Sequence, residues 1–278
     1  MSKWYTAFIV LLLLGISGSY AQAQVEEPQV VKLPQPKTPL SEGYHNSWGV
    51  DLMLNNFGFG IGGTYTHVLG PSDQLTFRTG ITGIRDDTEQ NFQSFLTGQQ
   101  IIPNKYKRAF GFPFLVGIRH RVFARQIADN FRPFISIAAG PAMAFTYPYL
   151  EDGDHNGFRT FNLVSSPYYQ QPILQPVERV NDFFTGWKNG HSHWGLSGEV
   201  KIGADIGSFK HPTTVEFGFF FYRFQPGLQI MEPYQPYGYD QQTGLPIEKN
   251  SNGQRKPFYD AQTFFGTPQI KFTFGGMW

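Results

Sequence analysis

Cysteine is absent from the 278 residues of the chain. This absence excludes a disulfide framework, a thiolate metal site, a Cys nucleophile and a bacterial lipoprotein anchor. Charge of either sign is scarce, because Asp, Glu, Lys and Arg make up 15 % of the chain, against about 25 % in ordinary soluble domains. The net charge is +1, so no basic excess points to nucleic acid. We therefore expect no nucleic-acid partner.

Aromatic residues and glycine are abundant instead. The chain has 28 Phe, 14 Tyr, 5 Trp and 31 Gly. Its mean hydropathy is nevertheless −0.31, which argues against a bundle of membrane helices. Few charges, many aromatics and a negative mean hydropathy together indicate alternating strands that have one apolar face and one polar face.

The first 23 residues have the pattern of a secretory signal peptide. Lys3 precedes an apolar stretch over 7–16, and small residues at Ala21 and Ala23 form an A-x-A cleavage site. The alternative, a membrane anchor, needs about 20 apolar residues. Residues 24–43 contain four prolines and predict an extended periplasmic tether. We expect export, cleavage after Ala21 or Ala23, and a folded domain over 44–278.

From residue 44 onward the dominant hydrophobic period is two, as in strands. Residues 193–206 show it best. One face carries Trp194, Leu196, Val200, Ile202, Ala204 and Ile206, and the other carries His193, Ser197, Glu199, Lys201 and Asp205. Similar alternation recurs over 47–55, 58–69, 74–85, 109–121, 131–147, 213–224 and 263–278. The pattern predicts eight strands, each with one apolar face and one polar face.

The links between these segments favour a membrane barrel. After a first short link near 55–58, long links over 87–108, 148–192 and 225–262 alternate with short ones over 70–73, 122–130 and 207–212. Outer-membrane barrels have short periplasmic turns and long outer loops, whereas a soluble sandwich has no reason for this asymmetry. A competing helix over 133–150 is interrupted by Pro133, Pro141 and Pro148. The sequence predicts an all-β, antiparallel, transmembrane up-and-down β-barrel.

The last strand carries a family resemblance. In 270–278, the residues Ile270, Phe272, Phe274 and Trp278 stand at alternate positions and end on an aromatic residue. Together with the signal peptide and the eight strands, this segment resembles the small outer-membrane β-barrel proteins. The resemblance implies that the final strand is the signal read by the barrel-assembly machinery. It also implies an outer-membrane location, with membrane lipid as a partner and a monomer as the default state.

Aromatic residues are placed where two membrane interfaces are expected. With the N-terminus in the periplasm, Trp48 and Trp278 fall at the periplasmic interface, and Tyr147, Trp194 and Tyr222 fall near the outer one. The alternative is that these rings belong to a soluble β core.

The inward face is predicted to hold a network of charges. Four acids and five bases share it: Asp51, Glu199, Asp205, Glu216, Arg78, Arg119, Arg121, Lys201 and Lys271. An eight-stranded barrel is just wide enough for its own side chains, and unpaired charges there would be costly. We expect a lumen filled by paired charges together with Phe220 and Tyr222, and a structural or interaction role for the outer loops. The alternative function is a narrow channel for small solutes or apolar molecules.

Two local motifs invite other chemistry. The run 190–194 (GHSHW) lacks the Gly that a nucleophile elbow requires after the Ser, so we expect no enzyme and no cofactor. The run 152–157 (DGDHNG) matches the first half of a calcium loop, with Asp152, Asp154 and Asn156 as candidate ligands. Its twelfth position is Leu163 rather than Glu, so a solvated acidic turn is the alternative.

Overall fold

The computed structural model describes residues 37–93, 100–124, 130–165 and 173–278. The predicted signal peptide and most of the predicted tether lie outside these ranges. The end of the tether forms a single 3₁₀ turn, η1 (Leu40–Glu42), which ends at Gly43 with φ +81°. The Tyr44 N–H donates to the Pro39 carbonyl over 2.8 Å and leads the chain into the first strand.

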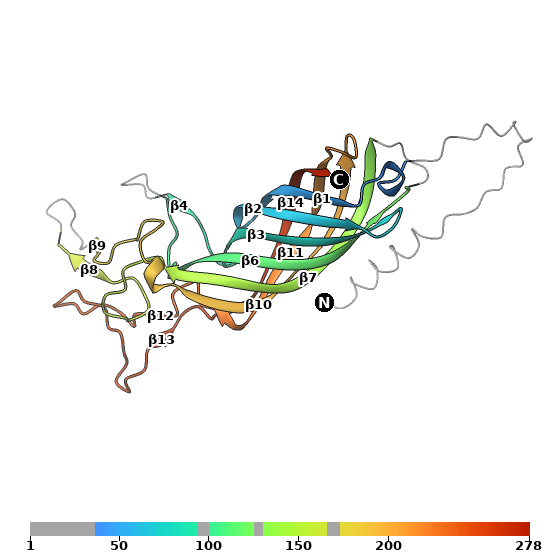
Figure 1. Ribbon diagram of the computed structural model, residues 1–278. Coiled ribbons are helices and arrows are strands. Elements are labelled where there is room, and N and C mark those ends of the chain that lie inside the picture. The colour runs from blue at the N-terminus through green and yellow to red at the C-terminus, as the bar shows by residue number, and fades with distance from the viewer. Residues whose placement is uncertain (1–36, 94–99, 125–129, 166–172) are drawn as a thin grey trace, which may run out of the picture. The chain divides into compact units, whose positions relative to one another are not determined.

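Eight long strands close into one antiparallel barrel (Figure 1). They are β1 (Asn46–Asn55), β2 (Gly58–Val68), β3 (Asp73–Ile84), β6 (Lys107–Arg121), β7 (Phe131–Pro148), β10 (His191–Ile206), β11 (Thr213–Leu228) and β14 (Gln262–Met277). The order around the barrel is β1-β14-β11-β10-β7-β6-β3-β2. Strands β1 and β14 close it, pairing from Ser47 with Met277 to Asn55 with Gln269. The predicted fold class is confirmed.

The alternating sequence pattern sets which face each side chain takes. On β10, Trp194, Val200 and Ile202 are exposed on the outside of the barrel, while Glu199 and Lys201 are buried in the lumen. Strand geometry sends successive side chains to opposite faces, so the apolar residues form a continuous outer surface. The helix considered for 133–150 is wrong, because this segment lies mostly in β7 and its outer face is exposed apolar surface.

The barrel wall is not equally tall all the way round. The hairpin between β1 and β2 ends at residues 55–58, and Asn55 pairs with Gln269, so residues 262–268 of β14 continue outward beyond the hairpin. The segment after β3 crosses this gap. Its Asp87 accepts a 3.0 Å hydrogen bond from Gln262 Nε2 and donates its N–H to Gln262 Oε1 over 3.2 Å. Phe57, at the hairpin, packs against the apolar interior.

The three long links carry small ordered elements of their own. They contain β4 (Phe92–Gln93) with β5 (Gln100–Ile101), β8 (Phe161–Val164) with β9 (Ile173–Pro176), β12 (Tyr234–Gln235) with β13 (Lys256–Pro257), and the 3₁₀ turn η2 (Trp187–Asn189). Figure 1 shows these small sheets at one end of the barrel and the C-terminus at the other. Among the described residues we find no helical segment with the length and hydrophobicity of a membrane span.

The long links are bonded to one another above the barrel. The N–H groups of Tyr106 and Lys107 both donate to the Ile230 carbonyl over 2.9 Å. The Arg159 N–H donates to a carboxylate oxygen of Glu232 over 2.8 Å, and Arg255 donates to the His155 carbonyl over 3.1 Å. The outer loops therefore form a connected cap.

Candidate functional site

The lumen gathers the charged residues that the alternation places inside. All nine predicted lumen residues are buried, with exposed fractions of 1–8 %. They come from six different strands. Each points inward because it lies an even number of positions from other inward residues of its strand. The lumen is therefore a candidate functional site made of side chains that lie far apart in the sequence.

Arg78 joins three strands across the lumen. It contacts Glu199 on β10, and its Nη2 lies 2.9 Å from Glu216 Oε1 on β11. The second oxygen of each carboxylate is bound by a lysine, with Lys201 Nζ 2.5 Å from Glu199 and Lys271 Nζ 2.5 Å from Glu216. Glu199 and Glu216 thus contact two cations each, which is the arrangement that makes buried charge tolerable.

The network continues toward the end of the barrel that holds Asn46 and Met277. Asp51 accepts 2.6 Å hydrogen bonds from Thr64 and Thr273, and Lys271 Nζ lies 3.7 Å from its carboxylate. Asp205 pairs with Arg119 and also accepts a 2.6 Å hydrogen bond from Thr214. The hydroxyl groups fill carboxylate lone pairs that the cations leave free.

A cation that the sequence analysis missed lies at this same end of the barrel. Arg132 is buried, donates to the Gly207 carbonyl over 2.6 Å, and its guanidinium lies 4.3 Å from the centre of the Phe209 ring. The Arg121 guanidinium lies 5.6 Å from the centre of the same ring, and the Tyr44 ring stacks on Phe209 with the ring centres 6.5 Å apart. Arg132 has the same parity as the inward Ser136, and that signal could have found it.

The outer half of the lumen is apolar. Phe220, Tyr222, Phe224 and Phe265 are each at most 2 % exposed and contact one another edge-on or stacked. The Tyr222 hydroxyl forms a 2.8 Å hydrogen bond with Thr82. The prediction that Tyr222 belongs to the outer aromatic girdle is wrong, because its parity with Glu216 points the ring inward.

A small cavity lies among the charged residues. The cavity between Arg78, Arg119, Glu216 and Lys271 has a volume of about 40 Å³. A single water needs roughly 10–15 Å³ of such volume. The charged part of the lumen has room for a few waters. The rings of Phe220, Tyr222, Phe224 and Phe265 fill the part of the lumen beyond it, toward the long links.

The predicted girdle residues divide into two groups. Trp48 and Trp194 are 59 % and 65 % exposed on the outside of the barrel, and Trp278 is exposed at the end opposite the long links. Tyr147 faces outward but is fully buried, because Trp187 of the loop before β10 packs on its ring with a centroid distance of 6.0 Å. Its placement among interface aromatics is therefore wrong.

The candidate assembly residues share one face of β14. Ile270 and Phe274 are exposed on the outside, and Phe272 is partly exposed with the same parity. They lie in the part of β14 that pairs with β1, where Leu54 faces Ile270 and Val50 faces Phe274. The same residues therefore line the seam that closes the barrel.

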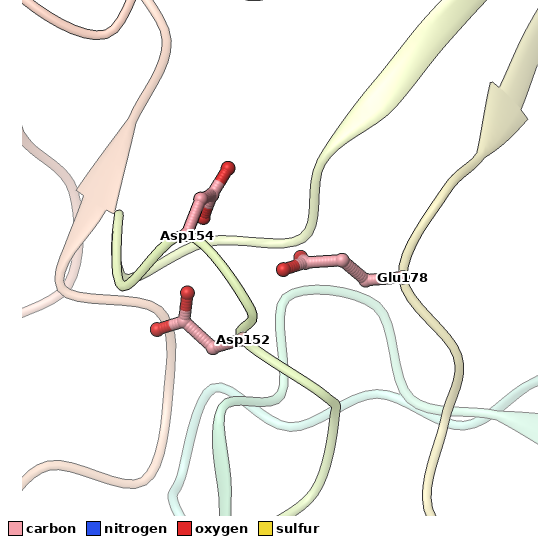
Figure 2. Close-up of side chains that lie close together, drawn as sticks. All are labelled: Asp152, Asp154 and Glu178. Atoms are coloured by element: carbon pink, nitrogen blue, oxygen red, sulfur yellow. The ribbon is translucent and has the colours of Figure 1, made fainter.

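The acidic run of the second long loop forms a cluster of a different composition from the one predicted. Oxygens of Asp152, Asp154 and Glu178 lie within 4.8 Å of one another. Figure 2 shows the Glu178 carboxylate pointing toward the loop that carries both aspartates. Asn156 offers no oxygen to the cluster, because its Oδ1 accepts from the Phe158 N–H and its Nδ2 donates to Asp154. Asn156 as a calcium ligand therefore stays a prediction.

The chain's own donors already occupy this cluster. Glu178 accepts 2.9 Å hydrogen bonds from the N–H groups of Gly153 and Thr160, and Asp152 accepts from Tyr106 over 3.0 Å. Burial raises the pKa of the Glu178 carboxyl, the two hydrogen bonds oppose the shift, and the two aspartates add to it. Glu178 comes from a segment beyond the window of the loop motif, so no spacing rule could have found it.

The His-Ser-His run opens β10. Because β10 begins at His191, the side chains of His191, Ser192 and His193 alternate between faces. His193 Nε2 lies 3.0 Å from the Thr146 hydroxyl. Neighbouring residues on a strand point apart, so this segment does not bring a serine and a histidine together as nucleophile and base.

Comparison with known proteins gives one structural likeness. No family model matches the sequence, and no curated protein matches it. The chain is similar to the N-terminal β-barrel domain of Pseudomonas aeruginosa OprF, known from a crystal structure, at 7 % identity and a TM-score of 0.31. The match covers 84 % of this chain and 98 % of that one. A TM-score of this size carries no functional argument, and the fold assignment rests on the strand pairing described above.

Proposed function

We propose that the protein is an outer-membrane barrel that anchors a connected cap of outer loops and does not conduct solutes. The exposed apolar outer surface supports a membrane position, because residues such as Phe59, Ile137 and Val200 would otherwise face water. A closed barrel also leaves no strand edge unpaired in lipid. The loop cap then faces the cell exterior and is available for adhesion or partner binding.

The observation that carries the non-conducting part is the Arg78 bridge. Strands β3 and β11 are four places apart in a ring of eight, so they stand on opposite walls. The bond from Arg78 to Glu216 therefore crosses the lumen. Above it, Phe220, Tyr222 and Phe265 fill the outer half. The alternative of a narrow channel requires a continuous passage, and a filled lumen favours the anchoring role instead.

Two experiments test the two parts of this proposal. Cell fractionation with a gel-shift assay on unheated and heated samples tests membrane location and barrel folding together. We expect an outer-membrane band whose mobility changes on heating, and a soluble protein without that change would overturn the location. Planar-bilayer recording of the purified barrel tests conduction. Reproducible single-channel steps that are absent from mock preparations would move the channel function into first place.

A further inference from the structure

A second cavity lies at the outer end of β3 and β6, and its lining includes the inward-facing Ile84 and Ala109 as well as outward-facing residues. Its volume is about 420 Å³, and we refer to it as the rim pocket. Its polar wall carries Arg85, Glu89, Lys105 and Arg108. Its apolar wall includes Phe110 and other side chains from β7, the β1–β2 hairpin and the loop before β10. The pocket therefore combines charged groups with aromatic rings, and the Arg108 guanidinium lies 5.9 Å from the centre of the Tyr147 ring.

The charged residues that line the pocket include fewer acids than bases. Glu89 is its one acid, and it serves two cations, with Lys105 Nζ at 2.8 Å and Arg85 Nε at 3.5 Å. Arg108 donates instead to the carbonyl groups of Asn181 and Asp182, over 2.9 and 2.7 Å. Carbonyl oxygens bring no charge, so the lining holds three positive charges and one negative charge.

Lys105 is the buried cation of the rim pocket. Burial lowers the pKa of its ammonium group below the ordinary value, Glu89 opposes the shift, and the nearby Arg108 and Arg85 add to it. The ammonium group also lies 5.9 Å from the centre of the Tyr149 ring. A further anion beside Lys105 would relieve the repulsion among these cations.

The apolar wall is made of packed rings on the outside of the barrel. Phe110 and Tyr147 stack with centroids 5.9 Å apart, and Phe183 meets Phe110 edge-on at 5.6 Å. Phe183 is 50 % exposed, so this wall continues onto the open surface. Phe57 from the β1–β2 hairpin lines the pocket as well.

The strand register fixes the height of the pocket. Exposed Trp194 is opposite Met143, which is opposite Phe112 on the next strand. Phe110 stands two residues farther outward on β6, which is about 7 Å at the usual rise per residue. Arg108 stands two residues farther outward again, so this cation lies farther outward along β6 than the ring of Phe110.

We propose that the rim pocket binds an anionic lipid of the outer leaflet, with a phosphate head on the cations and an acyl chain along the rings. The proposal rests on the membrane position proposed above. Arg85 Nη2 also donates to the Glu89 carbonyl over 3.0 Å and to Asn91 Oδ1 over 3.3 Å. The phosphate would add a charged partner to this guanidinium and to the Lys105 ammonium group. Free phosphate shares the head-group chemistry but makes no use of the apolar wall, so the two sources can be distinguished.

The test uses the purified full-length barrel in a neutral maltoside detergent, with dodecyl phosphate as the probe and native mass spectrometry as the readout. Inorganic phosphate supplies the head alone, and dodecyltrimethylammonium supplies the chain with the opposite charge. We expect one retained dodecyl phosphate per barrel and no retention of the other two. Equal competition by inorganic phosphate would overturn the lipid assignment, and so would retention of the cationic amphiphile.

Three variants and one control locate the site. Arg85→Gln should weaken binding at least fivefold, and Phe183→Ser should weaken it through the chain. Glu89→Gln should tighten binding, because it removes the acid that competes for both cations, and a merely structural role for Glu89 gives no such gain. Lys256→Gln, at an exposed lysine outside the pocket, should change nothing. Equal binding by the wild type, Arg85→Gln and Glu89→Gln would overturn the proposal.

The binding result is separable from the location result. Each variant is first shown to be a folded barrel by its heat-dependent gel mobility. Absence of binding by such a barrel would refute the lipid site while leaving the membrane position intact. A failure in cell fractionation would refute the membrane position whatever the detergent assay gave.

Discussion

Arg78 Nη2 lies 2.9 Å from Glu216 Oε1, although 138 residues separate the two in the chain and they stand on opposite walls of the barrel. The same guanidinium also contacts Glu199. One side chain therefore ties β3 to β10 and β11 through the interior, in addition to the hydrogen bonds that run around the wall. The lumen contributes to the structure of the barrel as well as lying inside it.

Replacing Arg78 by methionine should destabilise the barrel without opening it. The change leaves Glu199 and Glu216 with one lysine each, and breaking a buried pair costs about 3–5 kcal/mol. The rings of Phe220 and Tyr222 still fill the lumen, so the variant should show no single-channel currents in planar bilayers. Urea-dependent unfolding from lipid vesicles measures the loss of stability.

A surface pair gives the matched control for this change. Asp73 and His120 lie 2.7 Å apart at the end of the barrel opposite the long links and are each about half exposed. Asp73→Asn should therefore change the unfolding free energy by less than about 1 kcal/mol. If Arg78→Met cost no more than Asp73→Asn, the bridge would not stabilise the barrel. Conduction by Arg78→Met would show that the rings of Phe220 and Tyr222 do not by themselves block the passage of ions.

Gly111 is required for Tyr222 to lie across the lumen. A Cβ at Gly111 would stand 2.5 Å from the Tyr222 hydroxyl and from its ring. Gly111→Ala should displace the ring, break its hydrogen bond to Thr82, and cost about 1–3 kcal/mol as overpacking does. At outward-facing Gly63 the nearest atom to an added Cβ is 3.7 Å away, so Gly63→Ala serves as the control.

The measurement for this pair is again unfolding by urea, supported by Tyr fluorescence. Gly63→Ala should change stability by less than about 0.5 kcal/mol, as most surface substitutions do. Equal losses for both variants would assign the effect to the alanine backbone rather than to contact with Tyr222.

Much of the barrel could be predicted from period-two alternation. The pattern in 193–206 identified both faces of β10, and parity alone places Glu216 and Tyr222 in the lumen together. The error on Tyr222 came from assigning it by height along the strand and ignoring its face. Arg132 was missed for a related reason, since the weak alternation over 131–147 hid its parity with Ser136.

Features that depend on contacts between loops could not be predicted in this way. Tyr147 has an outward parity, and nothing near it in sequence indicates that Trp187 covers it. Glu178 reaches the aspartates from a segment more than twenty residues later in the chain. The rim pocket likewise combines Arg85, Lys105 and Phe183 from three separate segments. Such contacts follow from the closed barrel, which brings distant loops to one end.

Deleting residues 274–278 should prevent the barrel from closing. The deletion removes the pairs from Val50 with Phe274 to Ser47 with Met277, which are nearly half of the β1–β14 seam. An open seam leaves unpaired backbone groups that lipid does not tolerate. We expect the truncated chain to be degraded in the periplasm, as measured by fractionation and immunoblotting over time.

A point variant separates the seam from the proposed recognition by the assembly machinery. Phe274→Ala keeps every backbone pair and removes only an outward ring that is 48 % exposed. Slow insertion of this variant, with normal stability once folded, supports recognition of the outward residues. Normal surface display of the five-residue deletion would contradict both the seam argument and the signal assignment.

Glu232 should make the loop cap sensitive to pH. Its side chain is buried beneath the cap, where burial raises its pKa to about 7, opposed by the Arg159 N–H and guanidinium and reinforced by Glu178 and Asp152. An acid whose pKa is higher in the folded state binds its proton more tightly there than when unfolded. The stability it contributes is therefore present at low pH and is lost as pH rises from about 4.5 to about 7.

The expected readout is local opening of the cap and not unfolding of the barrel. Each pKa unit corresponds to about 1.4 kcal/mol, so the loss reaches a few kcal/mol, enough to change hydrogen exchange at the Arg159 N–H, which donates to Glu232. Exchange there should be faster at pH 8 than at pH 5, after correction for the intrinsic rate. Glu232→Gln should abolish this difference, since Gln keeps the acceptor and carries no charge. Asp260→Asn, at an exposed acid of the same loop, should leave the difference intact, and an unchanged pH profile in Glu232→Gln would assign the sensitivity to another group.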